Sequence, residues 1–154
     1  MTRVRLTLLA SLVAVGLLPA PAAAQRLTLT LTPRIVSFPS SDPDIIPLVI
    51  AAPVQVSYRV LQNNNAPWSL TVLAGGDLVS GPATVDISNI SWVATPAPPF
   101  QNGTLSKTVA QRAASGNGNV NPASIGSVTF RLANSWNYSV GTYTQTVIFT
   151  LSAP

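Results

Sequence analysis

Apolar and polar residues alternate along most of the chain from residue 26 onward. Residues 26–32, "RLTLTLT", place leucines on one face and threonines on the other. Residues 54–60, "VQVSYRV", and residues 68–74, "WSLTVLA", repeat the two-residue period. Successive side chains of a β-strand point to opposite faces of its sheet. The alternation therefore predicts antiparallel strands that each have one buried and one solvated face.

Two later stretches share this period and complete the expected core. They are residues 128–132, "VTFRL", and residues 143–151, "YTQTVIFTL", in which Gln145 interrupts the pattern. Aromatic and branched residues on the inward face of a strand favour burial between sheets. The core residues expected from the alternation are Trp68, Leu70, Val72, Phe130, Tyr143, Phe149 and Leu151.

Three segments are less regular. Pro47 lies within the apolar residues 45–50 and predicts an edge strand or a strand entry there. Residues 85–93, "VDISNISWV", change phase midway, and a β-bulge at residues 88–89 would explain the change. Residues 107–115, "KTVAQRAAS", are expected to form a strand followed by a loop.

Turn residues separate these segments throughout the chain. The sequence contains 14 prolines and 9 glycines, which leave no room for a long helix. About seven to nine short strands are expected in residues 25–154. Strands and turns at this spacing predict one all-β domain, an antiparallel β-sandwich of the immunoglobulin-like type.

The first 24 residues are typical of a bacterial export signal. Arg3 and Arg5 precede the apolar residues 6–18, and small residues lead up to Ala24. We expect cleavage after Ala24. A bilayer span needs about 20 apolar residues, so we expect no transmembrane span in the mature chain. The predicted product is exported and is secreted, periplasmic or associated with the cell surface.

The composition argues against catalysis. The chain contains no histidine, cysteine or glutamate and only four aspartates, so the usual general acids, bases and thiol nucleophiles are missing. We therefore expect a non-enzymatic protein without a cofactor and without disulfides. Its basic residues are scattered along the sequence, so no nucleic-acid-binding patch is expected.

Asp42 and Asp44, in "SDPD", are the one candidate pair for a metal ion. Two carboxylates could contribute oxygens to calcium, but calcium usually takes six to eight oxygen ligands. An aspartate before proline more often caps a turn with its own side chain. The turn is the favoured interpretation, so no metal site is expected.

The aromatic residues are the candidate binding residues. Trp68 begins an alternating strand, so burial in the core is its expected role, with a place on a binding surface as the alternative. Trp136 and Tyr138 lie in "NSWNYSVGTY", between two predicted strands. Exposed aromatic residues on such a loop would be better placed to contact a partner.

Two short motifs resemble those of WxL-domain surface proteins. "WSLTV" is a Trp-x-Leu motif at a strand start, and "GTYTQTVIFTLSAP" resembles the closing strand of that family. The chain departs from the family pattern there, because Phe149 and Leu151 stand in place of a second Trp-x-Leu. "GTYT" also resembles the last strands of fimbrial and spore-coat-U-type sandwiches. The resemblance implies a surface module that binds cell-wall polysaccharide or peptidoglycan, through positions that include Trp68 and Leu70.

A second hypothesis is a structural subunit of a surface fibre or coat. Residues 26–32 could add a strand to another copy or to another surface protein, because an extended segment can pair with an exposed sheet edge. The competing expectation is that this strand pairs within its own domain, as most strands do.

Overall fold

A computed structural model describes residues 25–62 and 65–154 of the chain, and this part is built almost entirely of strands. The predicted signal and its cleavage site at Ala24 lie outside the described residues. No helix in residues 25–62 or 65–154 is long and apolar enough to cross a membrane. The strands are β1 (Arg26–Thr32), β2 (Leu48–Ile50), β3 (Val54–Leu61), β4 (Pro67–Ala74), β5 (Leu78–Ser80), β6 (Ala83–Val85), β7 (Ile90–Thr95), β8 (Gly103–Thr104), β9 (Gln111–Asn117), β10 (Val120–Ala133) and β11 (Val147–Ser152).

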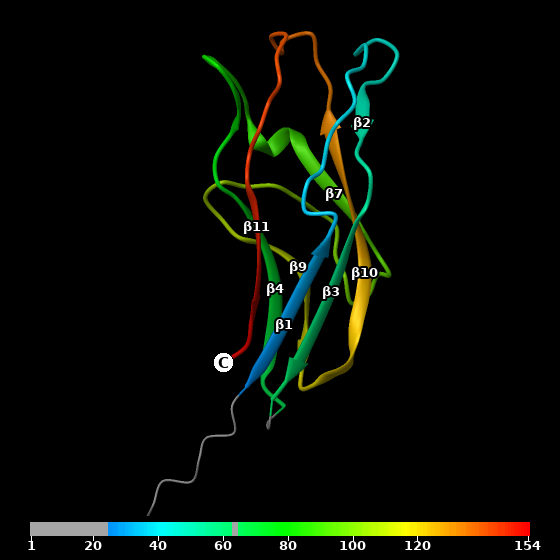
Figure 1. Ribbon diagram of the computed structural model, residues 1–154, viewed down its shortest axis with the longest axis vertical. Coiled ribbons are helices and arrows are strands. Elements are labelled where there is room, and N and C mark those ends of the chain that lie inside the picture. The colour runs from blue at the N-terminus through cyan, green and yellow to red at the C-terminus, as the bar shows by residue number, and fades with distance from the viewer. Residues whose placement is uncertain (1–24, 63–64) are drawn as a thin grey trace, which may run out of the picture.

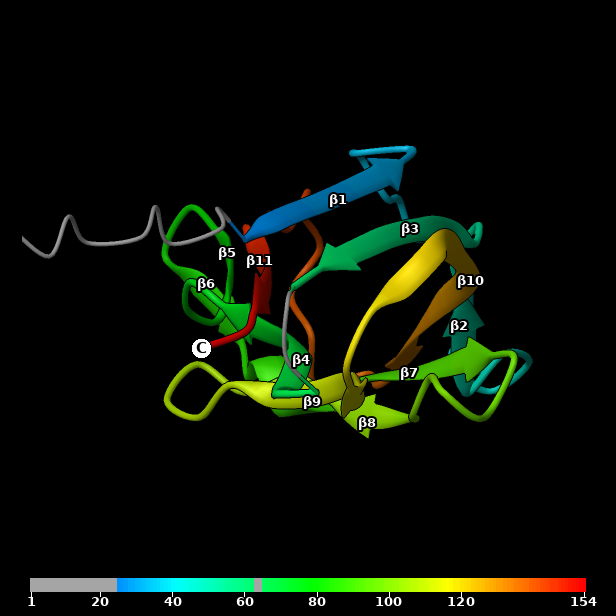
Figure 2. The ribbon, with the colours of Figure 1, turned by 90° about the horizontal axis from the view of Figure 1, so that it is seen from below.

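The strands form two antiparallel sheets that pack face to face (Figures 1 and 2). The larger sheet has the order β1-β3-β10-β7-β8, and β2 pairs with the far end of β10. The smaller sheet has the order β11-β4-β9, and β5 and β6 form a separate hairpin. This arrangement confirms the predicted all-β sandwich.

The alternation seen in the sequence sets which side chains lie between the sheets. Along β3, Val54, Val56, Tyr58 and Val60 are buried, and the residues between them are more exposed. Along β4 the same holds for every second residue from Trp68 onward. Because one face of each sheet is apolar, packing the two faces together removes both from water.

The predicted core residues differ in how deeply they are buried. Trp68, Leu70, Val72 and Phe130 are buried, and Tyr143, Phe149 and Leu151 are half-buried against them. Aromatic rings join the sheets at two places. The ring centroids of Tyr58 and Trp68 are 5.0 Å apart, and those of Phe130 and Phe149 are 6.5 Å apart.

The phase change in residues 85–93 arises from a short helix, so the predicted bulge at residues 88–89 is wrong. Residues Ile87–Asn89 form one turn of 3-10 helix before β7. Asp86 caps this turn, because its carboxylate accepts a hydrogen bond from the Ser88 backbone N–H at 2.8 Å. The turn inserts residues between two inward positions, so Ile87 and Ile90 are both buried.

Residues 107–115 follow the opposite order from the one predicted. The hydroxyl of Ser106 accepts hydrogen bonds from the backbone N–H groups of Thr108 and Val109, at 3.2 and 3.1 Å. These bonds close a loop, and the strand β9 begins only afterward. Local side-chain bonds of this kind compete with strand pairing.

Glycine permits one particularly close contact within the larger sheet's core. Gly126 lies in β10, opposite Val56 of β3, and the ring of Phe100 covers its backbone. A Cβ atom on Gly126 would overlap the ring of Phe100, which is 1% exposed, so the ring or the strand would have to shift within the packed core. The position therefore requires a residue without a side chain.

Gly126→Ala tests this close contact. We expect the substitution to lower the free energy of unfolding by about 1–3 kcal/mol, because it overpacks a filled core. Urea unfolding followed by far-ultraviolet circular dichroism measures the change. Ser127→Ala, at the next residue of β10, is the control. A Gly126→Ala protein as stable as the control would show that the ring can move aside.

Candidate functional site

Two long connections meet at one end of the sandwich and form the candidate site. The first, residues 33–47, links β1 to β2, and the second, residues 134–146, links β10 to β11. Both stand at the top of Figure 1, beyond the end of β10 and beside β2. We call these two segments the end loops.

Asn134 holds the end loops together. Its side-chain amide donates hydrogen bonds to the Ser41 carbonyl at 3.1 Å and to the Ile46 carbonyl at 3.1 Å. Its backbone N–H donates to the Pro47 carbonyl at 2.9 Å. One residue at the end of a long strand thus fixes a loop some 90 residues away in the sequence.

Trp136 is the prominent exposed side chain of the end loops. Its indole is 66% exposed, and its Nε1–H donates a hydrogen bond to Asp44 Oδ1 at 3.0 Å. Asp44 is held in turn, because its backbone N–H donates to Asp42 Oδ1 at 2.9 Å. The ring is therefore exposed to solvent and also fixed in orientation.

The Asp42–Asp44 segment forms the turn that its sequence favours. The Asp42 carbonyl accepts hydrogen bonds from the backbone N–H groups of Ile45 and Ile46, at 3.1 and 2.8 Å. Within the described ranges, no group of three or more His, Cys, Asp or Glu side chains is arranged to hold a metal ion.

Tyr138 supports the loop more than it presents a surface. Its side chain is half-buried against the core, and its hydroxyl donates to the Ala133 carbonyl at 2.8 Å. Burial raises the pKa of the Tyr138 phenol above its ordinary value of 10.0. The phenol therefore stays protonated at neutral pH and remains a hydrogen-bond donor.

Trp68, the third predicted binding residue, lies at the opposite end of the sandwich. It is 6% exposed and packs on Tyr58, near the turn between β3 and β4. None of the described residues accepts a hydrogen bond from its indole N–H. The structure thus brings Trp136 and Tyr138 together and separates both from Trp68.

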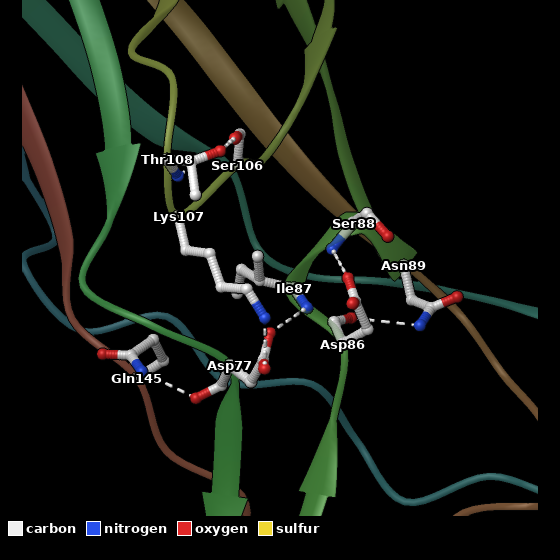
Figure 3. A network of polar contacts seen from close by, with 9 residues as sticks. All are labelled: Asp77, Asp86, Ile87, Ser88, Asn89, Ser106, Lys107, Thr108 and Gln145. Carbon is white, nitrogen blue, oxygen red and sulfur yellow. Dashed lines mark hydrogen bonds and ion pairs between the residues drawn. The ribbon is translucent and has the colours of Figure 1, made fainter.

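A second polar cluster, which the sequence did not indicate, joins four connections between strands (Figure 3). Asp77 Oδ2 forms an ion pair with Lys107 Nζ at 2.5 Å, and Asp77 Oδ1 accepts from the Ile87 backbone N–H at 3.1 Å. The Asp77 carbonyl accepts from Gln145 Nε2 at 2.6 Å. We call these four residues the polar node. No pattern in the sequence indicates that these four residues meet, because they are distant from one another along the chain.

The polar node also explains why β11 begins later than the alternation predicts. Gln145 turns its side chain toward Asp77, and its Oε1 accepts from the Thr146 backbone N–H at 2.7 Å. Thr144 makes only an isolated bridge with Val79. Tyr143 therefore lies in the connection before β11, although it still packs on the core.

The electrostatics of the polar node are those of a structural ion pair. The hydrogen bond from Lys107, followed by that from the Ile87 backbone, lowers the pKa of Asp77 below 3.8. The same pair raises the pKa of Lys107 above 10.5. Both groups are charged at neutral pH, so neither is suited to exchange protons as a general acid or base.

The chain matches no known family model, and no curated protein or solved structure shows significant similarity to it.

Lys107→Met tests the polar node through pH. The lowered pKa of Asp77 means that the ion pair stabilises the folded state above about pH 4, and that this contribution disappears as pH falls through the folded-state value. At pH 7 we expect the variant to have a slightly lower Tm than the wild type, because exposed pairs contribute little. The Tm difference should shrink toward about pH 2. Thermal melts of Thr108→Ala serve as the control, and a Tm difference that does not change with pH would contradict the assignment.

Proposed function

We propose that this chain is a non-catalytic, exported or cell-surface β-sandwich module that binds a cell-wall polysaccharide or peptidoglycan through Trp136. The observation that carries the proposal is the combination of exposure and fixed orientation at this indole. Trp136 is 66% exposed while Asp44 holds its N–H at 3.0 Å. An exposed aromatic ring that is already ordered loses little conformational entropy when a ligand packs on it.

The surroundings of Trp136 suit a sugar ring. A sugar presents an apolar C–H face and a rim of hydroxyls, so it pairs with an aromatic face that is bordered by polar groups. Asp44 accepts the indole hydrogen bond, and the hydroxyl of Ser135, the preceding residue, accepts one from the Asn137 backbone N–H. Ile45 and Val140, also on the end loops, are exposed apolar side chains. Exposed apolar patches with polar rims commonly mark interaction sites.

The inventory of reactive groups supports a binding role over catalysis. The chain has no histidine, cysteine or glutamate. Two of its four aspartates, Asp42 and Asp44, build the turn to which the Trp136 indole is hydrogen-bonded, and a third is paired with Lys107. The fourth, Asp86, caps the 3-10 turn. Each carboxylate thus already has a structural hydrogen-bonding role.

The positions that resemble the WxL pattern lie on neighbouring strands. Leu70 of β4 pairs with Leu151 of β11, and Val72 pairs with Phe149. Trp68-x-Leu70 and Phe149-x-Leu151 therefore meet across one strand pair on the inward face of the smaller sheet. This adjacency supports a sandwich fold like that expected from the WxL resemblance. The proposed binding of cell-wall polymer depends instead on the surface around Trp136.

Trp136→Ala tests the proposal. We expect the variant to lose binding to purified peptidoglycan or cell-wall polysaccharide by about tenfold or more, because an exposed aromatic anchor carries much of a small interface's energy. A pull-down with quantification of the free protein gives the affinity. Asp44→Ala, which keeps the indole but removes its acceptor, should cause a smaller loss.

The matched control is Ile125→Ala, which removes an exposed apolar side chain from β10 outside the end loops. Acrylamide quenching supplies a direct readout, since Trp68 and Trp92 are 6% and 1% exposed and Trp136 is the accessible indole. Bound polymer should protect Trp136 from the quencher. Protein that remains wholly in the supernatant, or a Trp136→Ala variant that binds as the wild type does, would refute the proposal.

The alternative is a structural subunit that assembles by strand exchange. One observation favours it: β1 is the outermost strand of the larger sheet. Within the chain β1 pairs with β3 along its whole length, which is the competing expectation for this strand. A strand at this place could pair with the β3 of another copy in the same register. Leu27, on its inward face, is 37% exposed, so β1 is less deeply packed than its neighbours.

Size measurements test the alternative. If strands are exchanged, light scattering should show oligomers that grow with protein concentration, and deletion of residues 25–32 should abolish them. A protein that is monomeric across the concentration range, with β1 intact, would exclude the fibre model. The concentration series keeps the test valid if the deletion prevents folding.

A further inference from the structure

A shallow depression lies on the smaller sheet, at the end opposite the end loops. Its volume is about 650 Å³, and the ends of β4, β9 and β11 line it. Ser69 pairs with Ser152 on one side and with Ser115 on the other, so the three serines form a row across the sheet. Neighbouring strands lie about 4.8 Å apart, so the row extends roughly 10 Å.

Arg112 is the one charged side chain that lines the depression, and Pro154, the last residue of the sequence, also lines it. Arg112 lies on β9, next to the serine row, and its side chain is exposed. No carboxylate of the described residues lies within 4 Å of its guanidinium, whereas Lys107 nearby is paired with Asp77. A planar guanidinium binds carboxylates and phosphates through two parallel hydrogen bonds.

Trp68 and Gly116 also line the depression, with the indole on the core face of the sheet, opposite the serine row. Gly116 pairs with Trp68, and a Cβ atom on Gly116 would lie 2.7 Å from Cζ2 and 3.2 Å from Nε1 of the indole. The missing side chain therefore lets the indole lie directly against the strand that borders the depression. Among residues 25–62 and 65–154 the Trp68 N–H has no acceptor, whereas those of Trp92 and Trp136 each have one. Nearly all buried hydrogen-bond donors in folded proteins have an acceptor, so an unpaired indole N–H is unusual.

We propose that this depression binds an acidic sugar unit of a polysaccharide, with Arg112 holding its carboxylate or phosphate and the serine row holding its hydroxyls. The choice of a sugar rests on the proposed function, whereas the site itself does not depend on Trp136. Hydroxyl groups both donate and accept hydrogen bonds, as sugar hydroxyls do, so a serine row is suited to a polyol. The open shape of the depression suits one unit of a longer chain better than an enclosed small molecule.

Titrations followed by 15N–1H correlation spectra test the inference. The three indole N–H signals, assigned with Trp→Phe variants, report on three places: Trp68 on the depression, Trp136 on the end loops and Trp92 on the core. The probes are trigalacturonate for the carboxylate, a sugar phosphate, neutral cellotriose and inorganic phosphate. We expect the two acidic sugars to shift the signals of Trp68 and Gly116 saturably and to leave Trp92 unchanged.

The variants separate charge from structure. Arg112→Gln should weaken the binding of trigalacturonate about fivefold at low salt, and Arg112→Lys should restore part of it. Arg59→Gln, an exposed arginine on the larger sheet, is the control. Wild-type affinity in Arg112→Gln would overturn the inference.

Each remaining outcome also decides the matter. Equal binding of inorganic phosphate and trigalacturonate would overturn the sugar assignment, because the site would then be a simple anion site. Shifts confined to the Trp136 signal would place acidic sugars on the end loops and overturn the proposal for the depression. Shifts at Trp68 that persist in Trp136→Ala would support the depression, even if the whole protein fails to bind cell-wall polymer in the pull-down.

Discussion

Aromatic rings packed against one another hold the two sheets of this protein in contact. The ring of Tyr58 meets Trp68 across the interior, and the ring of Phe130 meets Phe149. The chain has no cysteine, so no disulfide shares the task. Because interiors pack as tightly as organic crystals, each ring fixes the distance between its strands. The end loops and the depression both depend on that fixed distance, since each is built on the ends of strands from this core.

The two candidate binding surfaces, the end loops and the depression, lie at opposite ends of the sandwich and differ in polarity. At one end, Asn134 draws the end loops together and Asp44 orients the indole of Trp136, so an apolar ring is offered to solvent in a defined position. At the other end, regular strand pairing places serine hydroxyls in a row beside Arg112. The end loops, which are held by irregular hydrogen bonds, thus present an aromatic surface. The depression, which is formed by regularly paired strands, presents a polar surface.

The sequence predicted what depends on periodicity and missed what depends on particular side-chain bonds. Alternation identified β3, β4 and the inward faces that carry Trp68 and Phe130, because a two-residue period leaves few alternatives. It failed at residues 87–89 and at residues 107–115, where Asp86 and Ser106 bond to nearby backbone N–H groups. The hydrogen bond between Trp136 and Asp44 joins residues that are 92 positions apart, and a local sequence pattern cannot predict such a contact. The loop position of Trp136 was predictable, but its partner was not.

The pairing of β4 has a consequence for the order in which the molecule is assembled. Leu70 on β4 pairs with Leu151 on β11, so the central strand of the smaller sheet finds one of its two neighbours only after 81 further residues. Contacts between such distant segments are costly to close and slow to form. Until β11 arrives, one edge of β4 has no partner and the inner face of the sandwich stays partly open. A chain that emerges from its N-terminus would therefore complete the smaller sheet only after β11 has emerged.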